Sequence, residues 1–279
     1  MHIGVYMFPT DYAIRVDELA EEAERRGFES LWVPEHTHIP TSRKSPFPGG
    51  GELPKEYSHT LDPFVGLAAA AARTHQIRIA TGICLLIQRD TIVTAKEVAS
   101  LDQLSGGRFL FGIGGGWNRE EMEHHGTEYE SRFQRLEEQV EALKKIWTED
   151  EAEFHGEHVA FDKIWSWPKP FQKPYPPIIL GGHTRHTRQR VVDHCDGWLP
   201  IGFSTEAVLR GIEDLRERAE KAERDIGTIS VSVFGARADR ETLDSYDAAG
   251  VERVIFALPP AGRDKVLPKL DDLAQYLES

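Results

Sequence analysis

Apolar residues along the chain follow two alternating spacings, one typical of buried strands and the other of amphipathic helices. Residues 2–8 (HIGVYMF) form a nearly continuous apolar run, which predicts a buried strand. Residues 16–28 then carry apolar side chains three and four positions apart, and this spacing predicts a helix that ends at Gly27. Residues 30–35 (SLWVPE) predict the second strand.

The same alternation continues to the last residues and predicts eight strands, each followed by a helix. The predicted strands cover residues 2–8, 30–35, 77–86, 108–114, 177–182, 197–201, 229–235 and 253–258. Eight such units in 279 residues predict a closed (β/α)8 barrel, a TIM barrel, as a single domain over residues 1–279. An open doubly wound sheet would be expected to carry a glycine-rich turn after its first strand, and MFPTDY there contains no glycine.

Two irregular stretches interrupt the pattern. Residues 37–60, after the second strand, contain four prolines and a triple glycine, and are too long for an ordinary connection. We expect this segment to be a functional loop or lid. Residues 151–177, before the fifth strand, form a second insertion rich in aromatic residues and prolines. Its Trp165 and Trp167 are compatible with an apolar substrate, and equally with surface packing.

The active sites of (β/α)8 barrels lie in the loops at the carboxyl ends of the strands, so we expect the functional residues in these loops. Two of these loops are rich in glycine: residues 112–118 (GIGGGWN) and residues 181–187 (GGHTRHT). Glycines let a backbone approach an anionic group, and a helix N-terminus with Thr184 and Thr187 would supply donors. A plain turn with a capping threonine explains the second loop as well. The two loops together favour a phosphate site.

His36 directly follows the second strand, so we expect its ring at the barrel mouth. Its ordinary pKa near 6.5 suits it to donate or accept a proton. The neighbouring Glu35 carboxylate would either orient the imidazole ring for catalysis or simply be its hydrogen-bond partner. Residues 81–86 (TGICLL), with Phe8 and Trp117, would provide a flat apolar surface for a ring system, or belong to the upper core.

Composition narrows the remaining classes of function. The formal net charge of −13 argues against binding to nucleic acid or to anionic membranes. The two cysteines are too few for a disulfide framework. The first residues do not have the pattern of a signal peptide, and no apolar run is long enough to span a membrane. We therefore expect a cytoplasmic protein.

A metal-dependent hydrolase is the weaker alternative. His36 and His38 form an HxH pair of the kind that binds zinc, and His183 and Asp90 are the plausible further ligands. The other strand ends carry glycine, proline and aliphatic residues, and the motifs HExxH and GxSxG are absent from the sequence. We therefore predict no metal site.

The blocks LDQLSGGRFLFGIGGGWN (residues 101–118) and DGWLP (residues 196–200) resemble the luciferase-like monooxygenase superfamily. The sequence is most similar to its branch of coenzyme F420-dependent oxidoreductases, and the similarity covers nearly the whole chain. This resemblance implies a (β/α)8 barrel that binds F420, or FMN as the alternative, together with a small-molecule substrate. It also implies a homodimer, with the helices at residues 62–75 and 91–104 as the expected interface.

The resemblance also implies roles for individual residues. His36 would face the ring of the cofactor, with Glu35 beside it as the second catalytic residue. A cis peptide would join Gly82 and Ile83 behind the ring. The residues expected to contact the cofactor are Phe8, Gly82, Ile83, Cys84, Gly114, Gly115, Gly116, Trp117, Gly182, His183, Thr184 and Thr187. Residues 37–60 and 151–177 would cover the substrate at the mouth.

Two departures from the family limit the prediction of substrate. Bacterial luciferase has an arginine in the loop where this chain has Gly115, and the sugar-phosphate dehydrogenases of the family have a glutamate where Trp117 and Asn118 follow here. The resemblance still implies F420-dependent hydride transfer to or from a small organic substrate, whose identity these departures leave open. An FMN-dependent monooxygenase and a non-catalytic flavin-binding barrel remain the alternatives.

Overall fold

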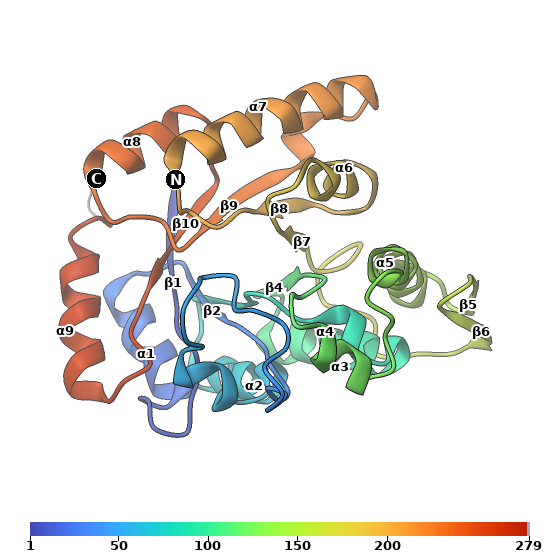
Figure 1. The fold of residues 1–279 in the computed structure, drawn as a ribbon, viewed down its shortest axis with the longest axis horizontal. Helices are drawn as coiled ribbons and strands as arrows, with labels where there is room; N and C mark the ends of the chain where they lie inside the picture. The colour runs from blue at the N-terminus through green and yellow to red at the C-terminus, as the bar shows by residue number, and fades with distance from the viewer. Residues whose placement is uncertain (278–279) are drawn as a thin grey trace.

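The computed structural model describes residues 1–277, and its centre is a closed barrel of eight parallel strands in the order β1-β10-β9-β8-β7-β4-β3-β2 (Figure 1). The barrel strands are β1 (His2–Tyr6), β2 (Ser30–Val33), β3 (Arg78–Thr81), β4 (Phe109–Ile113), β7 (Ile178–Gly181), β8 (Gly197–Leu199), β9 (Ser230–Phe234) and β10 (Arg253–Ala257). The predicted (β/α)8 barrel is confirmed. The strands are shorter than predicted. The largest difference is at β3, which ends at Thr81 before the chain turns into the short helix η2 (Leu86–Gln88).

Helices surround the barrel on its outer side (Figure 1). They are α1 (Val16–Arg26), α2 (Pro63–Arg73), α3 (Thr91–Ser105), α4 (Arg119–His124), α5 (Arg132–Thr148), α6 (Arg185–His194), α7 (Thr205–Lys221), α8 (Arg240–Ala248) and α9 (Arg263–Ala274). Their ends follow local chemistry. Gly27 ends α1 in the left-handed region at φ 90°, as predicted, and Asp62 and Asp90 cap α2 and α3 by accepting a backbone N–H. No helix among the described residues is long and apolar enough to cross a membrane.

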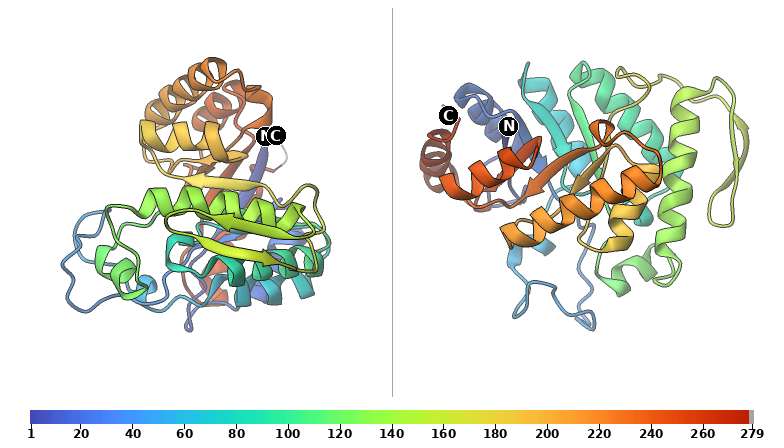
Figure 2. Two further views of the ribbon diagram at one scale, coloured as in Figure 1. Left: turned by 90° about the vertical axis from the view of Figure 1, so that its right-hand side faces the viewer. Right: turned by 90° about the horizontal axis from the view of Figure 1, so that it is seen from above.

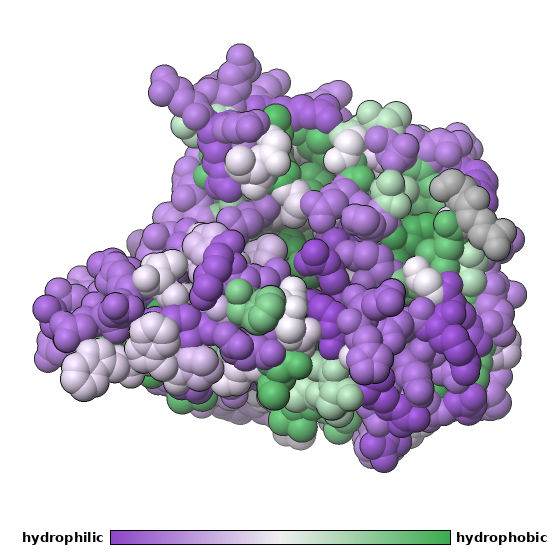
Figure 3. Space-filling model, turned by 180° about the vertical axis from the view of Figure 1, so that it is seen from behind, coloured by the Kyte–Doolittle hydropathy of each residue, from purple (hydrophilic) through white to green (hydrophobic). Residues whose placement is uncertain are grey.

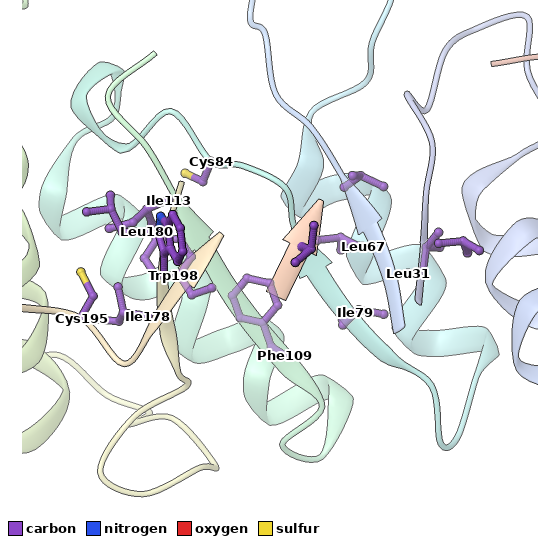
Figure 4. Packing of buried hydrophobic residues seen from close by; sticks show 14 of the residues in the cluster. Leu31, Leu67, Ile79, Cys84, Phe109, Ile113, Ile178, Leu180, Cys195 and Trp198 are labelled. Atoms are coloured by element: carbon purple, nitrogen blue, oxygen red, sulfur yellow. The ribbon is translucent and has the colours of Figure 1, made fainter. Parts of the chain in front are cut away.

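The core has two layers that serve different purposes. The outer layer lies between the strands and the helices, and Figure 4 shows part of it, including Ile113, Leu180 and Trp198. The inner layer fills the barrel and consists of Trp32, Ala80, Leu110, Ile179, Leu199 and Ile255. Tyr6, Ile83 and Phe234 pack on top of this inner layer and are only partly buried. They form the apolar floor of the barrel mouth.

The segment 151–177 does not cover the mouth, and that prediction is wrong. It contains an antiparallel hairpin, β5 (Ala152–His155) and β6 (Ala160–Ile164), which lies along α5 and projects outward (Figures 1 and 2). The Glu138 carboxylate on α5 accepts the backbone N–H groups of residues 157–159 at the hairpin turn, at 2.7–3.0 Å.

The remainder of this segment lies at the amino ends of the strands. Gln172 donates its backbone N–H to Asp102 at the end of α3, and its side chain donates to the carbonyl of Phe109, the first residue of β4, at 2.8 Å in each case. In a (β/α)8 barrel, a connection from a helix to the next strand lies at the amino ends of the strands. The active site lies at the opposite, carboxyl ends.

Gly112 sets the close approach of β3 and β4 just below the mouth. A Cβ at this position would lie 2.0 Å from the backbone oxygen of Thr81, which real Cβ atoms do not do. The Thr81 hydroxyl donates to the Gly112 carbonyl at 2.7 Å, so the two backbones are held together. Any side chain at residue 112 would separate the strands that carry the floor.

Replacing Gly112 by Ala is therefore expected to lower the free energy of unfolding by about 3 kcal/mol, the upper range for overpacking. Denaturant unfolding monitored by circular dichroism measures the effect. Gly66→Ala is the matched control. Its Cβ would lie 3.4 Å from the Val16 side chain, an ordinary van der Waals contact, and alanine favours the helical conformation of α2 more than glycine does. An unchanged midpoint for Gly112→Ala would contradict the assigned contact.

Candidate functional site

The mouth of the barrel has a flat, apolar floor. The rings of Tyr6 and Phe234 stack at 4.0 Å between centroids. Beside them lies Ile83, which follows a cis peptide bond between Gly82 and Ile83, as predicted. The Ile83 side chain reaches across the floor toward the ends of β4 and β7. A planar apolar ring system would find a complementary surface here.

The glycines of residues 112–118 are explained by packing within the protein. A Cβ at Gly114 would lie 2.0 Å from the Ile83 side chain, and one at Gly115 would lie 2.7 Å from the ring of Phe133. Gly116 adopts a φ of +61°, which favours glycine. The glycine content of this loop therefore makes room for the floor and for α5, and does not by itself indicate a bound phosphate.

His36 and Glu121 form a buried pair at the edge of the floor. His36 Nδ1 lies 2.8 Å from Glu121 Oε2, the histidine side chain is 6% exposed and the glutamate is fully buried. The carboxylate accepts the Nδ1 proton, which leaves His36 Nε2 as the nitrogen that faces away from the pair. The other carboxylate oxygen, Glu121 Oε1, is buried without a hydrogen-bond partner among the described residues.

Glu121 reaches His36 because α4 begins directly after the glycine-rich loop. Asn118 caps this helix by accepting the Glu121 backbone N–H at 3.3 Å, so Glu121 occupies the first turn. Nothing in the sequence marks Glu121 as a residue of the site. The spacing Asn118-x-x-Glu121 fits a capping box, in which the glutamate would bind the backbone of its own helix. Only the closed barrel, which brings the ends of β2 and β4 close together, shows that the Glu121 side chain points toward His36 after β2.

Glu35 does not orient His36, and this prediction is corrected by the structure. Its carboxylate accepts the backbone N–H of Leu85 at 2.6 Å and the Nε–H of Arg89 at 2.7 Å, on the opposite side of the strand end from His36. Glu35 thus anchors the turn after β3 that carries Ile83. We do not retain it as a catalytic residue.

Cys84 is likewise not a contact for a ligand at the mouth. Its side chain is fully buried in the outer core layer, and burial raises the pKa of its thiol well above the usual range, with the charge of Glu35 adding to the rise (Figure 4). Gly82 is also buried, packed against Phe234 and Trp32. From this stretch only Ile83 faces the mouth.

The loop after β7 and the start of α6 lie beyond β4 from these residues, with only that strand between β3 and β7. Thr184 caps α6 by accepting the Thr187 backbone N–H at 3.0 Å, so the capping interpretation holds in this structure. Arg188 pairs with Asp214 and donates to the His183 carbonyl at 2.7 Å. Gly182 and His183 remain accessible beside the first amides of α6.

The imidazole of His183 is engaged as an acceptor. Its Nε2 accepts the backbone N–H of Ile201 at 3.1 Å, and desolvation, followed by the charge of Arg188, lowers its pKa below the ordinary value. A neutral His183 adds no charge at this end of the mouth. An anion bound here would rely on the amides at the α6 N-terminus.

The loop of residues 37–60 crosses over His36 and reaches both neighbouring loops. On one side Ser45 donates its backbone N–H to Glu120 of α4 at 3.0 Å, and Phe47 packs edge-on against Trp117. On the other side Thr60 pairs with Thr10 after β1. Figure 2 shows this blue loop beside the green α4, well apart from the hairpin.

The two histidines of the HxH pair engage different partners. His36 binds Glu121, whereas His38 Nε2 lies 2.8 Å from Nδ1 of His124 and its Nδ1 lies 3.0 Å from the Thr37 hydroxyl. Within residues 1–277 no group of three or more histidine, cysteine, aspartate or glutamate side chains is arranged to hold a metal ion.

Glu120 is the main polar anchor of the loop of residues 37–60, and its loss is expected to loosen that loop. Glu120→Ala should raise amide hydrogen exchange in residues 37–60 about fivefold, equivalent to about 1 kcal/mol. Glu123→Ala is the control, because Glu123 pairs with Arg119 and not with the loop. Equal amide hydrogen exchange of residues 37–60 in the two variants would contradict the role of Glu120 as the anchor of this loop.

The anchor also has a defined pH dependence. Hydrogen bonds from Ser45 lower the pKa of Glu120 from its ordinary 4.5 to about 2. The charged contact is therefore complete above pH 4.5 and weakens as the pH falls toward 2. Exchange in residues 37–60 should stay constant from pH 7 to 5 after correction for intrinsic rates.

Comparisons with known proteins find relatives that match most of the chain. The chain is 35% identical over 282 residues to an uncharacterised protein of Mycobacterium tuberculosis, covering 99% of both. It is 29% identical to an FMNH2-dependent dimethylsulfone monooxygenase of Pseudomonas fluorescens, over 96% of this chain and 74% of that protein.

Solved structures share the fold at low sequence identity. A monooxygenase from Streptomyces bottropensis matches with a TM-score of 0.80 and 20% identity, over 100% of this chain and 99% of that one. An F420-dependent secondary alcohol dehydrogenase in complex with an F420–acetone adduct matches with a TM-score of 0.78 and 17% identity, over 98% and 97%. Residues 7–261 match the family of luciferase-like monooxygenases. The chain therefore belongs to this family.

Proposed function

We propose that the protein is an oxidoreductase that binds coenzyme F420 at the barrel mouth and transfers a hydride to or from a small organic substrate. The observation that carries the proposal is the buried His36–Glu121 pair beside the apolar floor. Together they place one oriented imidazole at the edge of a surface that suits a planar ring. When bound, a deazaflavin supplies two-electron hydride chemistry.

The residues at the mouth fit such a cofactor. Ile83 and the stacked pair of Tyr6 and Phe234 would support its ring system. The accessible backbone at Gly182 and His183 and the first amides of α6 would receive its phosphate. Trp117, half-buried and edge-on to His36, would wall the ring on one side.

His36 would hold or move the proton that accompanies hydride transfer. Glu121 fixes the imidazole with Nδ1 as its donor, so Nε2 is the nitrogen available to the ring edge or the substrate. Because Glu121 is fully buried, it orients the ring and stabilises the imidazolium without itself reaching the substrate. Glu121 is therefore a positioning residue.

FMN is the alternative cofactor, with monooxygenation as the reaction. The match to an FMNH2-dependent monooxygenase over 96% of the chain favours it, whereas the likeness to the F420-dependent dehydrogenase is one of fold. The apolar floor and the His36–Glu121 pair would suit the deazaflavin ring of F420 and the flavin ring of FMN alike. A protein that binds one of these cofactors without turnover is the remaining outcome.

Titration of the purified protein with F420 and with FMN, followed by fluorescence, tests the cofactor. We expect saturable binding of F420 that is tighter than that of FMN. Tighter binding of FMN would favour the monooxygenase, and binding of neither would refute the proposed site. Binding without oxidation of the reduced cofactor by any ketone, enone or imine would favour a non-catalytic barrel.

Replacing His36 by Ala is expected to lower kcat by a factor of about 10²–10⁴, with little change in the dissociation constant of the cofactor. Glu121→Gln keeps the volume and should lower kcat by a smaller factor, about tenfold. His38→Ala is the matched control, because His38 binds His124 and not the pair. If kcat of His36→Ala equals that of the control, His36 has no part in the reaction.

We also propose a homodimer formed through α2 and α3. Apolar side chains on the outer faces of these helices and of the loops before them are exposed: Leu61 (44%), Val65 (72%), Ile92 (38%), Val93 (55%) and Leu104 (72%). Exposed apolar side chains that gather on neighbouring elements mark interaction surfaces. Figure 3 shows how green, hydrophobic areas interrupt the polar surface on one face of the molecule.

The double variant Val65→Glu/Val93→Glu is expected to convert the dimer to a monomer, because it buries two charges in the interface. Light scattering after size-exclusion chromatography measures the mass. Phe203→Glu is the control, since Phe203 is 82% exposed but follows β8 on the other side of the barrel. A wild-type protein of monomeric mass would refute this interface.

A further inference from the structure

The loop of residues 37–60 carries a tyrosine into the mouth of the barrel. Tyr57 lies in the short helix η1 (Lys55–Ser58), whose start is fixed by the Tyr57 N–H donating to the Pro54 carbonyl at 3.3 Å. Its ring packs 5.3 Å from that of His36 and 4.7 Å from that of Phe8. Tyr57 is therefore a direct neighbour of the imidazole ring that Glu121 orients.

The surroundings of Tyr57 are aromatic. Phe47 packs edge-on against Tyr57 at 5.2 Å and against Trp117 at 6.1 Å, so the loop covers His36 with aromatic rings. Tyr6 and Phe234 form its floor. Flat apolar walls of this kind select an apolar, ring-shaped substrate.

The acidic groups around this space disfavour an anionic substrate beside Tyr57, whereas the Arg43 guanidinium lies over the Trp117 ring, 6.0 Å from its centroid. Glu35 and Glu120 are paired with Arg89 and Ser45 respectively. Glu56, next to Tyr57, lies close enough to Tyr6 and Tyr57 for its charge to raise the pKa of both phenols. A carboxylate bound beside these tyrosines would meet that negative charge. A neutral substrate meets no such repulsion.

The hydroxyl of Tyr57 is a donor at any physiological pH. Burial, followed by the influence of Tyr6 and Glu56, raises the pKa of Tyr57 to about 12. Tyr6 contributes to this rise in the pKa of Tyr57, so the two phenols are near each other. A substrate oxygen between Tyr57 and His36 would therefore accept a hydrogen bond from a protonated phenol.

We propose that Tyr57 is the substrate-oxygen donor of this site, and that the substrate is a neutral cyclic or aromatic ketone or the corresponding alcohol. This inference rests on the proposed function. In the direction of reduction, a bound reduced deazaflavin would supply the hydride to the carbonyl carbon, and the π electron pair of the C=O bond would move to oxygen. His36 Nε2–H gives that oxygen its proton, and Tyr57 holds the oxygen throughout. Solvent then returns a proton to His36.

Infrared difference spectroscopy with ¹³C-labelled cyclohexanone tests the hydrogen bond directly. A donor on the carbonyl oxygen weakens the C=O bond, so the carbonyl band should move to lower wavenumber in the wild-type protein with oxidised cofactor bound. Tyr57→Phe should return the band to its position in apolar solvent. Tyr12→Phe is the matched control, because Tyr12 is an exposed tyrosine whose ring lies against His59 and Lys55.

Kinetics supply the second readout. Tyr57→Phe should lower kcat/KM for cyclohexanone about tenfold, the effect of one lost hydrogen bond, with an unchanged dissociation constant of the cofactor. The wild type should use 4-oxocyclohexanecarboxylate at least tenfold less well than cyclohexanone. Equal activity on the carboxylate would overturn the neutral substrate class.

The outcomes separate this inference from the proposed function. If the wild type binds neither F420 nor FMN, the proposed function fails. If it binds a cofactor and reduces ketones, but Tyr57→Phe keeps both the shifted carbonyl band and the wild-type kcat/KM, the role of Tyr57 is refuted. If the wild type binds a cofactor but neither shifts the band nor reduces any neutral ketone, the substrate class is refuted.

Discussion

The hydrogen bond between His36 Nδ1 and Glu121 Oε2 ties together the ends of two strand–helix units that lie 85 residues apart in the chain. Both side chains are buried, and a buried carboxylate without a partner would be strongly destabilising. The pair therefore constrains its surroundings. α4 must begin at Arg119 so that Glu121 falls in its first turn, and the loop of residues 114–118 that connects it to β4 must be compact enough to permit this.

The neighbouring contacts can be understood as support for that pair and for the floor beside it. Glu35 holds the turn that presents Ile83, and Gly114 leaves the room that the Ile83 side chain occupies. The loop of residues 37–60 then closes over His36 with aromatic rings and is held to α4 through Glu120. An oriented imidazole, an apolar floor and an aromatic cover thus meet at one end of the barrel.

The barrel was predictable because eight repeats of the strand and helix spacings leave few other architectures for a chain of this length. His36 was predictable for the same reason, since it directly follows a strand. Glu35 was misjudged although a simple rule applies: successive residues of an extended chain point to opposite sides, so the neighbour of an inward-facing histidine faces outward. The same rule separates Ile83 from Cys84.

Glu121 was not predictable, because its local spacing to Asn118 is that of a capping box and its true partner is distant in sequence. The placement of residues 151–177 failed for a topological reason, as a segment between a helix and the next strand belongs to the amino ends of the barrel. The glycines of residues 112–118 show a further limit of sequence reasoning. Their number suggested a ligand, whereas their neighbours in the structure are Thr81, Ile83 and Phe133.

A crystal structure of the protein with F420 bound tests the central claim most directly. We predict that the deazaflavin ring lies on Tyr6, Ile83 and Phe234, that the phosphate of F420 meets the start of α6, and that His36 Nε2 faces the ring while Nδ1 stays on Glu121. A ring bound away from this floor, or a His36 that leaves Glu121 and turns from the ring, would contradict it.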